Sequence, residues 1–178
     1  MRTITYMSLV LLLAVFLVGC LTTGQIKVKD HFGGGVTHNS DIYSYDLDLN
    51  TNTDYTDNKD KIKTVDGVAV VGVVKNHLQT ELQAEIYISD DPSLETVEDI
   101  TDPKQATLVF VSPTVPGNDS LVIDWADGLV HMVNEQAVID QLIGPTADGM
   151  FTIYAIGNTD NFNFTYKADV VVVLTVEL

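Results

Sequence analysis

Apolar and polar residues alternate along most of the chain after residue 41. In 43–51, one face holds Tyr43, Tyr45, Leu47 and Leu49, and the polar residues between them fall on the other. The same period of two returns in 81–89. It is longest near the C-terminus, where seven apolar residues keep one phase: Phe164, Tyr166, Ala168, Val170, Val172, Leu174 and Val176. This period is typical of half-buried strands, so each of these segments is predicted to be a β-strand.

Further strands are predicted at 62–75, 106–112, 119–125 and 149–157, separated by turn signals such as Asp91-Pro92, Asp102-Pro103 and Pro116-Gly117-Asn118. About seven strands with such spacing favour an all-β fold. We therefore predict a two-sheet antiparallel sandwich, immunoglobulin-like or of a related Greek-key type.

One segment has helical periodicity instead. Its apolar residues recur at helical spacing: Leu129, Met132, Val133, Val138, Ile139, Leu142 and Ile143. Asp127 is a suitable N-cap, and Gly144-Pro145 is a stop signal. The pattern predicts one amphipathic helix over 128–143 that crosses the sandwich. Because Val171 and Val173 make the second face of the last strand apolar, we expect that face to be covered by this helix.

The N-terminus has the three parts of an export signal: a basic residue, Arg2, an apolar run from Leu9 to Val18, and small residues before a cleavage site. The run is ten residues long, half of what a membrane-spanning helix needs. It ends in Leu17-Val18-Gly19-Cys20, which contains the only cysteine of the chain. These four residues resemble the lipobox of bacterial lipoprotein precursors.

The resemblance implies that 1–19 is a signal peptide and that Cys20 carries fatty acyl groups, such as palmitate, that anchor the protein in a lipid bilayer. The location would be the extracytoplasmic face of the cell envelope. Leu21 in place of Asp after the cysteine resembles the pattern sent to the outer membrane in Gram-negative hosts. An ordinary secretory signal with an incidental Cys20 is the alternative.

Cleavage before Cys20 would leave a mature chain with 25 acidic residues, eight lysines and no arginine, a net charge of −17. Such a chain is unsuited to nucleic acid, which is bound through neutralised phosphates. We also expect the acidic domain to stand away from lipid headgroups and to touch the membrane through its acyl chains alone.

Residues 20–40 are predicted to be a flexible tether, with a single domain over 41–178. The tether contains Gly33-Gly34-Gly35, which usually marks a joint, and His31 and His38 are expected to be exposed there. Within it, the alternating run Ile26-Lys27-Val28-Lys29 leaves an edge strand as an alternative.

The richest polar stretch runs from Asp46 to Asp60. Its beginning, Asp46-x-Asp48-x-Asn50, is like an EF-hand loop, but Thr51 replaces the required glycine and Asp57 the required glutamate. An irregular calcium site would need four oxygen-bearing side chains to converge: Asn52, Asp54, Asp57 and Asp60. The alternative is a solvated strand face running into a polar loop, with no cofactor at all.

Trp125, the single tryptophan, and Tyr87 would form a sugar-stacking platform if they shared a solvent face.

The chain has no Gly-x-Ser-x-Gly, no His-Glu-x-x-His and no phosphate-binding loop. The sequence therefore predicts a membrane-anchored, non-enzymatic binding or structural domain whose protein or glycan partner is not encoded in a motif. The alternatives are a calcium- or carbohydrate-binding module and, third, a hydrolytic enzyme.

Overall fold

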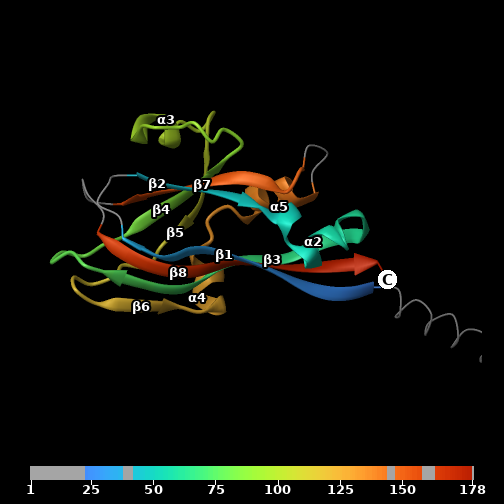
Figure 1. Cartoon of the computed structure of the whole chain (residues 1–178), viewed down its shortest axis with the longest axis horizontal. Coiled ribbons are helices and arrows are strands. Elements are labelled where there is room, and N and C mark those ends of the chain that lie inside the picture. Colours follow the sequence, from blue (N-terminus) through green and yellow to red (C-terminus); the bar gives the residue numbers. More distant parts are fainter. Residues whose placement is uncertain (1–22, 38–41, 144–146, 158–162, 178) are drawn as a thin grey trace, which may run out of the picture.

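The computed structural model describes residues 23–37, 42–143, 147–157 and 163–177. Within these ranges it has eight strands: β1 (Thr23–Thr37), β2 (Ile42–Asp48), β3 (Ile62–Asn76), β4 (Ala84–Ser89), β5 (Thr107–Val111), β6 (Ser120–Ile123), β7 (Met150–Gly157) and β8 (Phe164–Glu177). The strands form two layers (Figure 1). One layer, the β8 sheet, has the order β1-β8-β3-β6, and the other, the β7 sheet, has the order β2-β7-β4-β5.

Every strand pair in both sheets is antiparallel. The chain changes sheet at each connection except the one from β4 to β5. This order is a jelly roll, the double Greek key of eight strands. The predicted two-sheet antiparallel sandwich is thus confirmed, with eight strands and a jelly-roll order rather than that of an immunoglobulin domain.

The last strand, β8, has the register that its sequence predicts. All seven residues of its apolar row point into the core, and none is more than 7% exposed. On its opposite face, Val171 is 1% exposed, so the second half of the strand is covered on both sides as expected.

The predicted flexible tether is wrong for residues 23–37, which form β1. This strand pairs with β8 from Thr23↔Glu177 to Thr37↔Thr165. Its inward residues Val28 and Phe32 are 1% and 5% exposed. The three glycines coincide with a register shift between Phe32 and Val36, so they form a bulge in a paired strand rather than a joint. The alternating run at 26–29 belongs to an edge strand, and His38 lies outside the described residues.

The predicted single helix over 128–143 is two helices, α4 (Trp125–His131) and α5 (Glu135–Ile143). Asp124, not Asp127, is the N-cap of α4, and Asp127 completes a capping box with it. The helix breaks because residues 132–134 pair with β5: Met132 bridges Phe110, and the Val133 amide donates to the Val109 carbonyl at 2.9 Å. In the part of the chain that the structure describes, no helix is long and apolar enough to cross a bilayer.

The helix α4 packs directly on the backbone of β3, on the outer face of the β8 sheet. A Cβ atom at Gly128 would lie 2.6 Å from the Val70 carbonyl oxygen and 3.0 Å from the Ala69 Cβ. At the start of the helix, the Trp125 ring lies over Gly67. A side chain at 128 would force the helix off the sheet.

The outer face of the β7 sheet is covered by the long connection from β4 to β5, which contains α3 (Val97–Thr101). Tyr154, fully buried, holds this connection from β7. Its hydroxyl donates to the Asp91 carbonyl at 2.7 Å and accepts from the Leu94 amide at 3.2 Å. Each sheet therefore has part of its outer face covered.

We expect Gly128→Ala to destabilise the protein by about 1–3 kcal/mol, because the added methyl overpacks the contact with β3. Glycine to alanine inside an exposed helix ordinarily stabilises by about 0.5–1 kcal/mol, so the sign is diagnostic. Urea unfolding measures the difference. Val130→Ala is the control, because Val130 is on the same helix and 80% exposed. A stabilised Gly128→Ala protein would show that α4 does not pack this closely.

Candidate functional site

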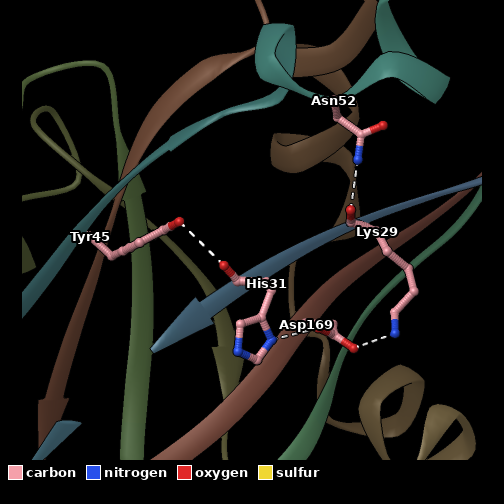
Figure 2. Close-up of polar contacts among 5 residues, drawn as sticks. All are labelled: Lys29, His31, Tyr45, Asn52 and Asp169. Carbon is pink, nitrogen blue, oxygen red and sulfur yellow. Dashed lines mark hydrogen bonds and ion pairs between the residues drawn. The ribbon is translucent and has the colours of Figure 1, made fainter. Parts of the chain in front are cut away.

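The outer face of the β8 sheet carries a polar cluster where β1 meets β8 (Figure 2). The Asp169 carboxylate accepts from two side chains of β1, from Lys29 Nζ at 2.5 Å and from His31 Nδ1 at 2.9 Å. Every second residue of a strand points to the same face of the sheet. The pairing His31↔Asp169 therefore places Lys29, His31 and Asp169 on one face. The histidine of the predicted tether thus lies on a strand and has a carboxylate partner.

The open edge of β1 is covered by one residue of β2, Tyr45, and by Asn52 in the connection that follows β2. Asn52 Nδ2 donates to the Lys29 carbonyl oxygen at 2.7 Å, and the Tyr45 hydroxyl lies 3.4 Å from the His31 carbonyl oxygen (Figure 2). Unpaired backbone groups on an edge strand are a template for unwanted pairing. These two contacts occupy part of that edge and join the two sheets at their corner.

The environment of this cluster changes the ionisation of two carboxyl groups. Partial burial raises the pKa of Asp169, but the hydrogen bonds and charges of Lys29 and His31 outweigh it and leave the pKa below its usual value. Burial raises the pKa of the neighbouring Asp30. The cluster holds β1 against β8 through the contacts of Asp169 with Lys29 and His31.

The four residues predicted to hold calcium lie in the connection between β2 and β3. This connection contains the short helices η1 (Leu49–Thr51), α2 (Thr53–Thr56) and η2 (Lys59–Lys61). Asn52 caps α2 through its Oδ1 atom, which accepts from the amides of Asp54 and Tyr55, while its Nδ2 atom is bonded to β1.

The three aspartates of this set are not gathered around a common point. Asp54 lies in the first turn of α2, Asp57 is its C-cap, and Asp60 lies in η2. No group of three or more histidine, cysteine or carboxylate side chains in the described residues is placed to hold a metal ion. The predicted convergence is therefore not found, and the asparagine of the set is a structural cap.

The two aromatic residues of the predicted sugar platform do not share a face. Trp125 covers Gly67 of the β8 sheet, whereas Tyr87 lies on β4 of the β7 sheet and is 8% exposed. The Tyr87 hydroxyl donates to Glu85 Oε2 at 2.7 Å. Burial and this contact raise the pKa of Tyr87 to about 12. Tyr87 is a buried packing residue, and the platform is not formed.

A polar hollow of about 410 Å³ lies between β2, β7, α5 and the start of the β4–β5 connection. It was not predicted from the sequence. Four aspartates line it: Asp46, Asp48, Asp90 and Asp148. A second hollow, of about 280 Å³, adjoins it and shares Asp90 and Gln141. The polar face of β2 was visible in the sequence, but the approach of α5 depends on long-range packing.

Several of these carboxylates already accept hydrogen bonds from their own surroundings. Asp46 Oδ1 accepts from the Thr152 hydroxyl at 2.7 Å, Asp48 Oδ1 from the Asn50 amide at 2.9 Å, and Asp148 Oδ1 from the Met150 amide at 2.9 Å. The hollow is negatively charged and open. It suits a partner that brings cationic or hydrogen-bond-donating groups.

A small apolar cavity of about 70 Å³ lies inside the sandwich, beside an aromatic cluster formed by Phe32, Tyr43, Phe164 and Tyr166. The Tyr166 hydroxyl is buried there beside Tyr43, and burial is the main cause that raises the pKa of Tyr166. Ligand sites commonly measure about 300–1,000 Å³, so this cavity is a packing gap in the core.

No protein-family model and no curated protein sequence matches this chain. Among solved structures, the chain is similar to one of desmodium yellow mottle tymovirus, at a TM-score of 0.36 and 8% identity, over 88% of this chain and 89% of that one. It is also similar to a chain of the empty head of turnip yellow mosaic virus, at a TM-score of 0.34 and 9% identity, over 88% and 83%. Likenesses this weak do not bear on what the chain does.

We expect Asn52→Ala to lower the free energy of unfolding by about 0.5–2 kcal/mol, because it removes the cap of α2 together with the bond to Lys29. Asn52→Asp keeps the capping oxygen and loses only the donor, so it should cost less. Urea unfolding of the two variants measures both effects. Equal losses would show that the cap contributes nothing.

We expect the stability that Asp169 provides to depend on pH. Its pKa is lowered in the folded protein, so its contribution is present above the unfolded pKa and is lost as the pH falls through the folded pKa. Asp169→Asn should therefore be less stable than the parent at neutral pH, and the two unfolding free energies should converge in acid. Glu81→Gln, at an exposed position, is the control. A difference that persists unchanged at low pH would contradict the ion pairs.

Proposed function

We propose that this chain is a lipid-anchored, extracytoplasmic protein of the bacterial cell envelope, acylated at Cys20, whose jelly-roll domain is a non-enzymatic binding or structural module. The observation that carries the proposal is the sequence Leu17-Val18-Gly19-Cys20 at the end of an export leader. Two or more acyl chains would give stable attachment, since one chain alone binds marginally.

The position of the first strand supports this proposal. Among the described residues, pairing starts at Thr23, three positions after Cys20 in the sequence. Cleavage before Cys20 would thus remove none of the eight described strands. Cys20 itself lies outside the described residues.

We place the binding role of the domain at the polar hollow. It gathers Asp46, Asp48, Asp90 and Asp148 at an open surface, and none of the chain's lysines lines it. A partner with cationic groups would meet a negative field there, and the nearest lysine among the hollow-lining residues is Lys104 in the adjoining hollow. Calcium held by the β2–β3 connection and a glycan held by Trp125 have no such geometric support.

We expect Cys20→Ala to abolish acylation and release the protein from membranes. Mass spectrometry of the mature protein should show diacylglycerol on the parent and none on the variant, and fractionation should move the variant from the membrane to the soluble fraction. Thr22→Ala is the matched control, because it changes the same segment and keeps the cysteine. A Cys20→Ala protein that stays in the membrane with acyl chains would refute the proposal.

A further inference from the structure

The end of the sandwich at which β1 begins is also the end closest to Cys20. Only Leu21 and Thr22 lie between that cysteine and Thr23. A chain of three residues spans at most about 10 Å even when fully extended. If Cys20 is acylated, as the proposed function holds, the first residues of β1 must lie near the headgroup layer.

The same end contains the close of β8 and the approach to β3. Thr23 is paired with Glu177, and Ile62 with Val176, so η2 and the first residues of β3 lie at the same end of the β8 sheet as the start of β1, on the other side of β8 (Figure 1). We call this the anchored end and define it as residues 23–26, 58–63 and 174–177 together with Asp66, whose carboxylate accepts from Gln25 Nε2 at 2.9 Å and from the Thr175 hydroxyl at 2.6 Å.

The anchored end differs in charge from the rest of the protein. It holds three of the eight lysines of the mature chain, Lys59, Lys61 and Lys63, all exposed. Its acids are Asp60, Asp66 and Glu177, so three lysines and three acids give a net charge of 0, whereas the remainder of the mature chain carries −17. Asp54 and Asp57 lie in α2 and at its C-cap and belong to that remainder.

The three lysines differ in whether they form an ion pair within the described residues. Lys63 Nζ lies 2.6 Å from Glu177 Oε2. Lys59 and Lys61 have no ion-pair partner within the described residues. Long lysine side chains can extend their ammonium groups toward lipid phosphates, while a negatively charged body is repelled from an anionic surface.

We propose that the anchored end is a docking surface for the lipid headgroups of the membrane that holds Cys20, with Lys59 and Lys61 binding headgroup phosphate. The sandwich then stands on this end, and its acidic remainder points away from the bilayer. This replaces the expectation of a domain held off the membrane by a tether, because residues 23–37 are a strand.

Lysine footprinting of the acylated full chain tests the proposal. The protein is placed in vesicles of phosphatidylethanolamine and phosphatidylglycerol, and each lysine is modified with a water-soluble amine reagent and quantified by mass spectrometry. We expect several-fold slower modification of Lys59, Lys61 and Lys63 than in detergent solution, with Lys75 and Lys167 unchanged. Both of these exposed lysines lie at the opposite end of the β3–β8 pairing.

The variant Lys59→Glu/Lys61→Glu should lose the protection of Lys63 in vesicles, while Lys75→Glu/Lys167→Glu, which makes the same change in charge, should keep it. Circular dichroism checks that both variants are folded. Acylated protein whose lysines are all modified as in detergent would overturn this proposal and leave the anchor standing. Mature protein without acyl chains would overturn the proposed function as well.

Discussion

The structure depends on the pairing of β8 with both of its neighbours. This strand is bonded to β1 on one side and to β3 on the other along almost its whole length. Its inward row packs against the β7 sheet, and a shift of one residue would turn that row to the outside. The register of β8 therefore fixes the registers of β1 and β3. It determines where α4 packs on β3 and where Asn52 bonds to β1 at the corner of the sandwich.

Much of the fold was predictable because its strands alternate strictly. The period of two located β2, β4 and β8, and the apolar second face of β8 indicated that a helix would cover it. The local sequence pattern gave a wrong prediction where contacts with a distant part of the backbone determine the structure. In β1 the three glycines hide an alternation that pairing with β8 confirms, and the helix after β6 is broken because Val133 bonds to β5.

The candidate site was less predictable than the fold, for a physical reason. Aspartate and asparagine supply metal ligands, but they also accept hydrogen bonds from backbone amides two or three residues ahead, which makes them common at turns and helix starts. In this structure these residues act as acceptors for backbone amides. Asn52, Asp91 and Asp124 each accept from such an amide. A sequence rich in these residues therefore gives little indication of which carboxylates meet. The hollow formed by β2, β7 and α5 became visible only in three dimensions.

The short connection between Cys20 and β1 has a mechanical consequence. A pull on acyl chains at Cys20 would reach the first strand with almost no slack to absorb it. Since β1 lies antiparallel to β8 along its length, a force along the strand axis would load many rungs of the ladder together instead of opening them one by one. If Cys20 is acylated as proposed, the domain would resist extraction of its anchor by shear, which would make the N-terminal strand part of the attachment as well as part of the fold.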